Sequence, residues 1–367
     1  MQKKIWILNH GLVNGGTDTF TIQLAAGLKK RQYNVSVVMA IDPDAAKQAR
    51  EHIVSELGIP LYRTKDPVGI HGMLLHAYRL YKLLKVHKPD VFHANMDLFN
   101  GVNMFVAWLA RVPVRVCHSH TSQSQYETNT GKHFTVSLYR KFMKTLCRVF
   151  ANRYCGCSSL AMQYLFDDRW KSNAHAAIIY NGINLDAFRP VQSLPKERKD
   201  CYQIITVGRI SIPKNPMFIV EIAEQLSRLR QDFELLWVGD GEMKEEAEKA
   251  VHEKKLEPYI RFLGSRSDIP DILHQADVFI LPSLFEGLGI VLIEAQAAGL
   301  YCIASNRVPT EADCGLCAFL PIKDAGVWAV RISEIFDRGV QQKADEALLR
   351  RFDAEYMIDQ LEKVYFG

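Results

Sequence analysis

The chain has 367 residues, a formal net charge of +4, and a composition that is 48% hydrophobic and 23% charged. These values exclude wholesale disorder, collagen and coiled coil, and the length suits two domains or one large one. The most apolar stretch, residues 101–110, has about half the length needed to span a bilayer. We therefore expect a soluble protein that contacts a membrane at most peripherally, and the scattered cysteines described below favour the reducing cytoplasm.

Charge differs between the two halves. Residues 1–190 hold 24 Lys and Arg against 12 Asp and Glu, a net +12, whereas residues 191–367 hold 21 against 29, a net −8. The basic half should prefer an anionic surface or substrate, and charge alone does not choose among nucleic acid, phospholipid and a phosphorylated acceptor. The eight cysteines are scattered, mostly in apolar runs, and Cys314-Gly-Leu-Cys317 lacks the other ligands of a zinc site, so buried thiols are expected.

Short β-branched or aromatic runs alternate with longer amphipathic stretches along the chain. This alternation predicts parallel sheets covered by helices, and hence an α/β fold with two doubly wound domains. The predicted strands are residues 4–9, 35–39, 91–94, 114–118, 153–157, 177–180, 203–207, 234–238, 260–263, 278–281 and 301–304.

A linker is predicted at residues 189–200, which contain two prolines, a cluster of charges and no apolar periodicity. The expected division is an N-terminal domain of residues 1–189, a second domain of residues 190–351, and a C-terminal helix in residues 352–367 that packs back toward the first domain. In such sheets ligands bind beyond the carboxyl ends of the strands, beside helix N-termini. Function should therefore lie in the loops that follow the strands.

The first such loop runs from Asn9 to Asp18 and leads into a helix predicted to begin near Thr19. Its glycines, Gly15 and Gly16, allow a phosphate to approach a helix N-terminus, with Thr17 or Asp18 as the cap. The loop lacks the GxGxxG spacing of a dinucleotide site, which disfavours NAD. A turn shaped only for packing remains the alternative.

Two further loops carry charges. After the strand 203–207 come Gly208, Arg209 and, five residues later, Lys214, a pair of cations suited to a diphosphate unless both are merely solvated. After the strand 278–281 come Glu286 and a Gly-Leu-Gly turn at residues 287–289, then a helix predicted from about residue 290 to 298. Glu294 lies on that apolar helix, where an unpaired carboxylate is costly, and sugar hydroxyls would serve as partners.

These motifs, in this order, resemble family 4 of the retaining, nucleotide-sugar-dependent glycosyltransferases, which have the GT-B fold of two Rossmann-like domains facing a central cleft. The resemblance covers nearly the whole chain. It includes Asn181-Gly-Ile-Asn184, Val207-Gly-Arg209, Val238-Gly-Asp-Gly241 and Phe262-Leu-Gly264; Pro309-Thr-Glu311 and His118-Ser-His120 look like the bacterial exopolysaccharide and capsule branch. The Thr17-Asp18-Thr19 segment departs from the acidic residue and arginine of many relatives, which affects the acceptor side.

The resemblance implies a role for each matched residue. Glu294 would bind the ribose hydroxyls and Glu286 the donor sugar, while Arg209 and Lys214 would bind the diphosphate. His120 matches the active-site histidine of the N-terminal domain, with His118 as its competitor. The implied catalytic residues are His120, Glu286, Arg209 and Lys214, and the implied donor-binding residues are Gly15, Gly16, Gly208, Arg209, Lys214, Arg266 near the nucleobase, Glu286, Gly287, Leu288, Gly289 and Glu294.

The implied activity is transfer of a hexose, with retention, from a nucleotide-diphosphate sugar to a glycan or polyprenyl-diphosphate-linked acceptor in cell-surface polysaccharide biosynthesis. UDP is the expected nucleotide. No metal or other cofactor is expected, because the one Asp-x-Asp spacing, Asp42-Pro-Asp44, is remote from the nucleotide motifs and suits a turn. The alternatives are a non-catalytic nucleotide-binding GT-B protein and a GT-B nucleotide-sugar epimerase; a nucleic-acid partner is disfavoured because no recognition motif is present.

A basic amphipathic helix is predicted at residues 134–150. It carries Arg140, Lys141, Lys144 and Arg148 beside apolar residues, a pattern typical of helices that lie on anionic membranes. The alternative is a domain helix whose apolar face is core and whose basic face is solvated.

Overall fold

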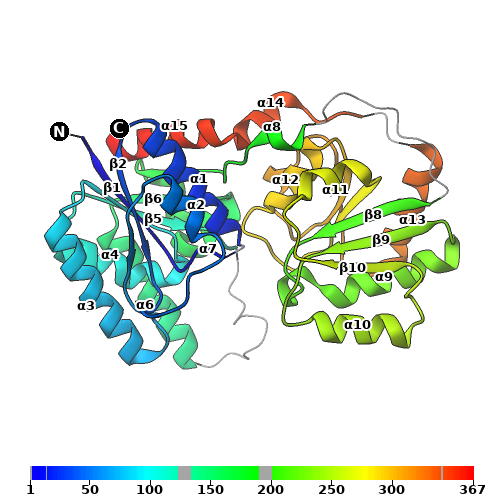
Figure 1. Cartoon of the computed structure of the whole chain (residues 1–367), viewed down its shortest axis with the longest axis horizontal. Coiled ribbons are helices and arrows are strands. Elements are labelled where there is room, and N and C mark those ends of the chain that lie inside the picture. Colours follow the sequence, from blue (N-terminus) through cyan, green and yellow to red (C-terminus); the bar gives the residue numbers. More distant parts are fainter. Residues whose placement is uncertain (1, 14, 123–133, 190–200, 340–341) are drawn as a thin grey trace. The chain divides into compact units, whose positions relative to one another are not determined.

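The computed structural model describes residues 2–13, 15–122, 134–189, 201–339 and 342–367. The chain divides into two compact units: residues Met1–Ile183 with Asp353–Gly367, and residues Asn184–Phe352 (Figure 1). Each unit is a parallel sheet between helices, so the predicted fold class is confirmed.

The first unit contains a seven-stranded parallel sheet. Its central strands are buried along their length because helices cover both faces, as Ile5 to Leu8 show. In sheet order the strands are β3 (Leu61–Arg63), β2 (Asn34–Met39), β1 (Lys4–Asn9), β4 (Val91–Ala94), β5 (Val114–Ser119), β6 (Arg153–Gly156) and β7 (Ala176–Ile178).

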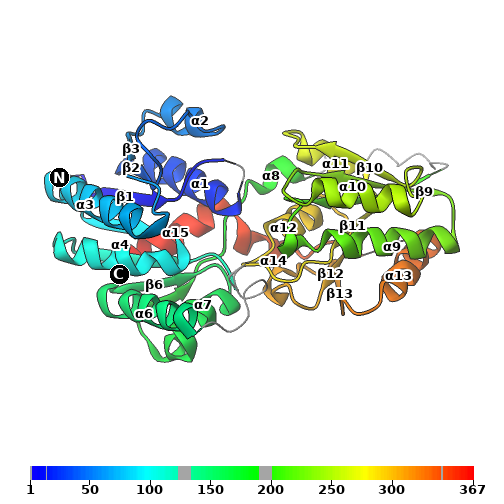
Figure 2. The same cartoon turned by 90° about the horizontal axis from the view of Figure 1, so that it is seen from below.

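Two groups of helices cover that sheet. One face packs against α1 (Gly16–Lys30), α2 (Glu51–Glu56) and the C-terminal α15 (Ala354–Phe366). The other face packs against α3 (Gly69–His87), α4 (Asn100–Leu109), α6 (Phe134–Phe150) and α7 (Ser159–Phe166), of which α3 and α4 lie side by side in Figure 2. Short 3-10 turns, η1 (Asp97–Phe99) and η2 (Asp167–Ser172), follow β4 and α7.

The second unit contains a six-stranded parallel sheet. In sheet order its strands are β10 (Ile260–Gly264), β9 (Phe233–Val238), β8 (Tyr202–Val207), β11 (Val278–Leu281), β12 (Tyr301–Ser305) and β13 (Cys317–Leu320). The helices are α8 (Leu185–Phe188), α9 (Pro216–Leu229), α10 (Lys244–Glu253), α11 (Ile269–Gln275), α12 (Ile290–Ala297), α13 (Ala325–Arg338) and α14 (Glu346–Leu349), with 3-10 turns η3 (Ile212–Lys214), η4 (Thr310–Ala312) and η5 (Arg350–Phe352). Helices α9, α10 and α13 pack together against one face.

The units divide at Ile183, six residues before the predicted boundary at 189. The reason is α8, whose Leu185 and Phe188 are buried and which packs against α12 of the second unit. The Phe188 carbonyl also accepts a hydrogen bond from Nε2 of His274 at 2.7 Å. The predicted linker lies, from residue 190 onward, outside the described residues.

Within the ranges given above, no helix combines the length and apolar character needed to cross a bilayer.

Candidate donor and acceptor sites

The strand order of the second unit reverses between β8 and β11. At such a reversal, neighbouring loops leave the carboxyl edge of the sheet in opposite directions, and the crevice between them is where open α/β sheets bind ligands. Gly208, Arg209 and Lys214 follow β8, while Glu286 follows β11. The sequence-predicted residues therefore flank the reversal point.

Lys214 and Glu286 meet across this point. The Lys214 ammonium lies 2.6 Å from Oε1 of Glu286, and the Ser283 hydroxyl donates a hydrogen bond to the same oxygen at 2.7 Å. Their side chains are only 22% and 13% exposed, so solvent screens this ion pair less than a surface pair.

One backbone and one side-chain hydrogen bond hold the two loops together. The Leu284 amide donates to the Pro213 carbonyl at 2.8 Å, and Nδ2 of Asn215 donates to the Pro282 carbonyl at 3.2 Å. The loop after β8 is thereby tied to the loop after β11. These two hydrogen bonds hold the loops of Lys214 and Glu286 close to each other.

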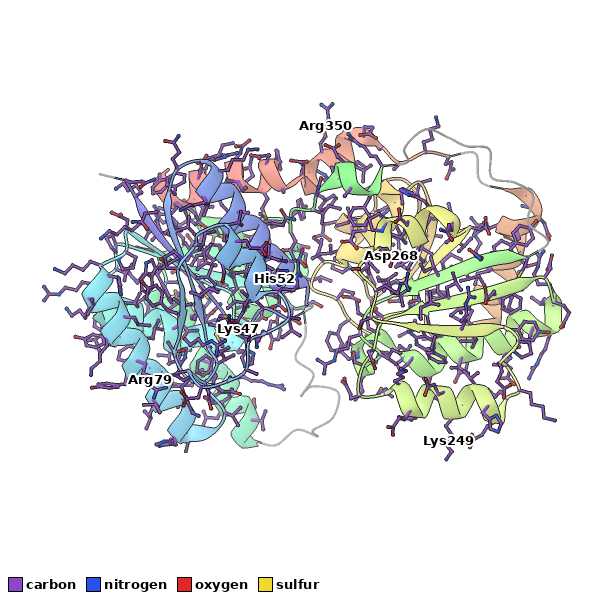
Figure 3. The ribbon with its side chains drawn as sticks, in the orientation of Figure 1. Lys47, His52, Arg79, Lys249, Asp268 and Arg350 are labelled. Atoms are coloured by element: carbon purple, nitrogen blue, oxygen red, sulfur yellow. The ribbon has the colours of Figure 1, made fainter. Side chains whose placement is uncertain are left out.

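The other two predicted cations have partners elsewhere. Arg209 is 71% exposed and donates from Nε to Glu242, 3.0 Å away, so this structure does not bring it to the Lys214–Glu286 pair. Arg266 follows β10 and pairs in bidentate fashion with Asp268, which is one of the residues labelled in Figure 3. Both arginines lie at the carboxyl edge of the sheet, where a ligand would compete with their carboxylate partners.

At two positions of the predicted donor-binding set, the structure gives a steric reason for glycine. A Cβ on Gly208 would lie 3.1 Å from Cε of Lys214, so glycine leaves room for the lysine stem. Gly289 has φ of +89°, a left-handed conformation that favours glycine, and it is the N-cap of α12. Gly287 and Leu288 precede it, and the Leu288 side chain is buried, so this turn presents its backbone to the carboxyl edge.

Glu294 lies in the middle of α12. Burial raises the pKa of its carboxyl to about 7, against the smaller opposing effect of the Lys214 charge. Among the described residues no hydrogen bond to this carboxylate is recorded. A half-buried carboxyl with a raised pKa is typical of a functional site and can serve polar ligand groups such as hydroxyls.

The glycine loop of the first unit differs from the sequence prediction in its cap. Helix α1 begins at Gly16 rather than near Thr19, and the N-cap is Gly15 rather than Thr17 or Asp18. Asp18 instead accepts hydrogen bonds from the Gly15 amide at 2.9 Å and from Nδ2 of Asn9 at 2.9 Å. The loop lies beside the reversal point of the first sheet, which falls between β1 and β4.

The two candidate histidines occupy different environments. His118, on β5, is fully buried, and its Nδ1 lies 3.0 Å from Nε2 of His93. His120 follows the end of β5, is partly exposed, and donates from Nε2 to Oδ1 of Asn95 at 2.9 Å. Burial lowers the pKa of His120 to about 3, against a smaller opposing effect of Asn181, so this imidazole is neutral at physiological pH.

The sequence did not lead us to two residues beside His120, which are Asn95 and Asp97. Asp97 accepts hydrogen bonds from the His120 amide at 2.7 Å and the Thr121 amide at 3.2 Å, while Asn95 contacts the His120 ring. Burial raises the pKa of Asp97 to about 6, although these hydrogen bonds oppose the shift. Both follow β4 directly, so the rule that ligand-binding loops follow strands would have pointed to them.

Helix α6 only partly fits its prediction. Met143 and Cys147 are buried, but Phe142 and Val149 are 58% and 63% exposed. Lys144 and Arg148 both form ion pairs with Asp167 and are largely covered. The helix has the predicted bounds, 134–150, but the alternative of a purely solvated basic face and a purely buried apolar face does not describe it.

The remaining motifs carry no cluster of ligands. Burial raises the pKa of Cys314 to about 12, so it is a thiol, and Cys317 shifts in the same direction. Asp42 accepts from Nζ of Lys65 at 2.6 Å within a turn region. In the part of the chain described, no group of three or more His, Cys, Asp and Glu side chains is arranged to hold a metal ion.

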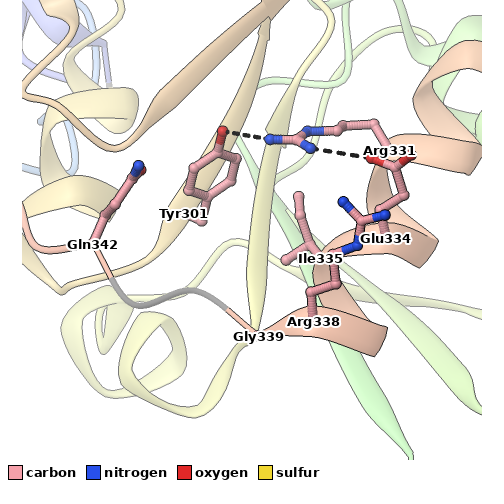
Figure 4. Close-up of a pocket in the computed structure, with 7 residues that line it drawn as sticks. All are labelled: Tyr301, Arg331, Glu334, Ile335, Arg338, Gly339 and Gln342. Atoms are coloured by element: carbon pink, nitrogen blue, oxygen red, sulfur yellow. Dashed lines mark hydrogen bonds and ion pairs between the residues drawn. The ribbon is translucent and has the colours of Figure 1, made fainter.

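Figure 4 shows a pocket between β12 and the C-terminal end of α13. Arg331 donates there to the Tyr301 hydroxyl at 3.0 Å and to Glu334. Because Tyr301 is the first residue of β12, this pocket lies at the amino edge of the sheet, opposite to the Lys214–Glu286 pair. It does not belong to the donor site.

The fold is shared with sugar transferases. HepE of Anabaena, solved in complex with UDP and glucose, matches 99% of both chains with a TM-score of 0.78 at 18% identity. A sucrose-phosphate synthase of Thermosynechococcus elongatus matches 99% of this chain and 98% of its own with a TM-score of 0.78 at 20% identity. The two parallel-sheet α/β units of this chain thus have the GT-B fold.

Sequence comparisons give the family. The family described as Glycosyltransferase Family 4 matches residues 14–187, and the family described as Glycosyl transferases group 1 matches residues 191–314. EpsF of Bacillus subtilis, named as a glycosyltransferase, is 28% identical over 99% of this chain and 96% of its own. The UDP-Gal:alpha-D-GlcNAc-diphosphoundecaprenol alpha-1,3-galactosyltransferase of Escherichia coli is 30% identical over 62% of this chain and 60% of its own. The chain belongs to the GT-B glycosyltransferases of the family 4 type.

Proposed function

We propose that this glycosyltransferase transfers a hexose, with retention, from a UDP-sugar to a glycan or polyprenyl-diphosphate-linked acceptor in cell-surface polysaccharide biosynthesis. The observation that carries the proposal is the Lys214–Glu286 pair at the reversal point between β8 and β11. Further support comes from relatives: HepE binds UDP and glucose, the Escherichia coli relative acts on a lipid-linked sugar, and a Staphylococcus aureus relative is named for capsular polysaccharide.

The chemistry follows from these charges. Glycosyl transfer passes through an oxocarbenium-like state while negative charge grows on the departing diphosphate. In the proposed mechanism, the diphosphate displaces Glu286 as the partner of Lys214, and the freed Glu286 carboxylate accepts hydrogen bonds from the donor sugar. Arg209 and the N-terminal amides of α12 add positive potential at the leaving group.

No protein nucleophile is assigned. We propose front-face displacement, in which the leaving phosphate helps to deprotonate the acceptor. His120 would contact the acceptor side in its neutral form, because burial holds its pKa near 3. Turnover should be unaffected by a chelator, whereas loss in EDTA with recovery in manganese would contradict the metal-independent part of the proposal.

A thermal-shift panel tests the donor. UDP, GDP, ADP, dTDP and NAD are compared in chelator on the wild type, Glu294→Ala and the control Glu245→Ala, whose side chain is exposed on α10. A ligand at about 100 times its dissociation constant adds roughly 2.7 kcal/mol to the free energy of unfolding. We expect selective stabilisation by UDP that Glu294→Ala reduces and Glu245→Ala preserves; selection of another nucleotide would contradict the UDP assignment.

Product analysis separates transfer from its rivals. Incubation of a UDP-hexose with a lipid-linked sugar acceptor should yield UDP and a new α-linked glycan. An epimerase would return the isomeric sugar without transfer, and a non-catalytic protein would bind UDP without consuming the donor. Either result would contradict the proposed activity.

We also propose a peripheral contact with anionic membranes, through the face formed by α3, α4 and α6. The three helices contain seven Lys and Arg, three in α3 and four in α6, and no Asp or Glu. The same helices expose large apolar side chains: Ile70, Leu74, Tyr78, Val86, Phe105, Trp108, Leu109, Leu138, Tyr139, Phe142 and Val149. We call this surface the three-helix face.

The three-helix face has a hollow at its centre. An apolar groove of about 540 Å³ runs between the helices, lined among others by Leu74, Tyr78, Phe105, Leu109 and Phe142. Exposed apolar patches of this kind mark interaction sites, and cationic rims favour anionic lipid as the partner. A bilayer is therefore the proposed occupant.

A further inference from the structure

Three histidine rings lie together in the first unit. His93 on β4 and His118 on β5 have ring centroids 5.2 Å apart, and His118 and His120 stack with centroids 4.1 Å apart. Phe20 of α1 packs against all three rings, at 5.9, 4.9 and 4.7 Å from His93, His118 and His120. We call these three rings the histidine stack.

A hydrogen-bond chain runs through the stack to the end of the protein. Oη of Tyr365 and Nδ1 of His93 share a hydrogen bond of 2.6 Å, and Nε2 of His93 and Nδ1 of His118 share one of 3.0 Å. Tyr365, His93 and His118 are all buried, with 1%, 0% and 0% of their surface exposed. Tyr365 enters this chain from α15, far along the sequence from β4 and β5.

The hydrogen-bond chain couples the positions of the ring protons on His93 and His118. Burial lowers the pKa of His93 to about 3 and that of His118 well below its usual value, so both rings are neutral. A neutral imidazole has one N–H donor and one acceptor, so the hydrogen bond at one nitrogen dictates the role of the other. The tautomers of His93 and His118 are therefore coupled to the direction of the Tyr365 hydrogen bond: when the hydroxyl donates to Nδ1 of His93, Nε2 of His93 donates to Nδ1 of His118, and when the hydroxyl accepts, both directions reverse.

We propose that Tyr365 is a positioning residue for His120. Its hydroxyl terminates the Tyr365–His93–His118 chain, the chain fixes the His118 ring, and the His118 ring supports the His120 ring that stacks on it. Asn95 holds the other side of His120. This inference rests on the proposed acceptor-side role of His120.

Ion pairs anchor helix α15, which carries Tyr365, to the end of α1. Arg31 at the end of α1 forms ion pairs with Glu355, Asp359 and Glu362 along one side of α15. The same two helices supply Phe20 and Tyr365, and both aromatic rings contact the stack. Packing of α1 against α15 thus fixes both supports of the histidine stack together.

The test compares Tyr365→Phe with Tyr356→Phe. Both remove one hydroxyl from α15, but Tyr356 is 44% exposed and is the matched control. We expect Tyr365→Phe to lower kcat about 10-fold through misplacement of His120, while KM for the donor and the affinity for UDP stay unchanged. Tyr356→Phe should match the wild type in all three. A kcat of Tyr365→Phe within about twofold of the wild type would overturn the proposal.

Nuclear magnetic resonance separates this inference from the proposed function. Long-range proton–nitrogen spectra of nitrogen-15 histidine-labelled protein report the tautomer of each ring, with signals assigned through His93→Gln, His118→Gln and His120→Gln. Tyr365→Phe should shift the ring nitrogens of all three histidines, and Tyr356→Phe should shift none. If only His93 responds, Tyr365 does not act on His120 and the proposal fails, whether or not the protein transfers sugar.

Discussion

Lys214 and Glu286 neutralise each other in the structure, and only 22% and 13% of their side chains are exposed. A bound diphosphate offers Lys214 more negative charge than one carboxylate does, so exchange of partners is favourable when the donor arrives. In the proposed mechanism the same exchange releases Glu286 from Lys214 at the point where the donor sugar is expected. In the proposed mechanism one ion pair therefore prepares the groups that bind both the diphosphate and the donor sugar.

Replacement of Lys214 tests this exchange. Lys214→Ala should lower kcat by about 100- to 1,000-fold, as expected for loss of one preorganised group that stabilises developing charge, and should weaken UDP binding less. The control is Lys249→Ala, an exposed lysine of α10. Initial rates and calorimetric titration with UDP measure the two quantities; wild-type turnover in Lys214→Ala would contradict the assigned role.

Glu294 makes stability depend on pH in a defined direction. Its pKa rises from 4.5 to about 7 on folding, so the folded state binds the proton more tightly than the unfolded state. The contribution is fully present below pH 4.5 and is lost as the pH rises toward 7. Glu294→Gln, which mimics the protonated acid, should therefore gain melting temperature relative to the wild type across this interval.

Calorimetric scans of both proteins across that interval provide the measurement. Glu245→Gln, at an exposed position of α10, is the control and should follow the wild type. A constant difference between Glu294→Gln and the wild type at every pH would show that the Glu294 carboxyl titrates alike in both states.

The sequence indicated the individual charged residues of the site but not their partners. Arg209, Lys214, Glu286 and Glu294 stood out because each follows a strand or interrupts an apolar helix. Contacts such as Lys214 with Glu286 join residues 72 positions apart, and no local pattern encodes them. The same limit hid Tyr365, which lies 272 positions from His93.

At the scale of elements, the pattern of apolar residues along the sequence predicted the buried strands well. Strands β1, β4 and β11 begin and end where the sequence placed them, because continuous apolar runs mark strands buried on both faces. The strands that the sequence did not indicate, β3 and β13, are edge strands of three and four residues with only partial burial. Short, half-exposed runs carry too little apolar signal to be recognised.

The contact between α1 and α15 offers a test at this scale. A Cβ on Gly27 of α1 would lie 1.8 Å from Cδ1 of Ile358 on α15. Gly27→Ala should therefore destabilise the protein by about 1–3 kcal/mol through overpacking, despite the better helix propensity of alanine. Denaturant unfolding measures the change.

Ile358→Val removes the atom responsible. Alone, Ile358→Val should lower the free energy of unfolding by about 0.5–1.5 kcal/mol, because a buried methyl group is lost. Together with Gly27→Ala the cost should be smaller than the sum of the two by about 1 kcal/mol or more. Additive costs would show that α15 shifts to accept the extra methyl group, and the close approach of the two helices would then have no steric basis.

At the scale of the whole molecule, charge and chemistry are divided between the units. The proposed donor-site residues Arg209, Lys214, Glu286 and Glu294 all lie in the second unit, although the sequence from residue 191 onward has a net charge of −8. The excess of positive charge lies in the first unit, where α3 and α6 contain no acidic residue. The residues proposed to bind the nucleotide therefore do not account for the basic excess, and we propose the acceptor and an anionic membrane as its partners.

Vesicle pelleting tests the membrane as that partner. The exposed lysines of the three-helix face, Lys82, Lys85 and Lys141, are replaced together by Glu, and Lys249→Glu on the second unit is the control. Each lysine near an anionic surface contributes about 1 kcal/mol, so loss of three should cost on the order of 3 kcal/mol, a fall in partitioning of about 100-fold. The wild type and the control should pellet with phosphatidylglycerol vesicles at low salt, and neither should pellet with phosphatidylcholine alone.

Phe142→Glu should also weaken binding to the vesicles, because it places a charge in the apolar groove. Equal pelleting of the triple variant and the control would show that the acid-free helices do not contact lipid, and the basic excess would then be assigned to the acceptor alone.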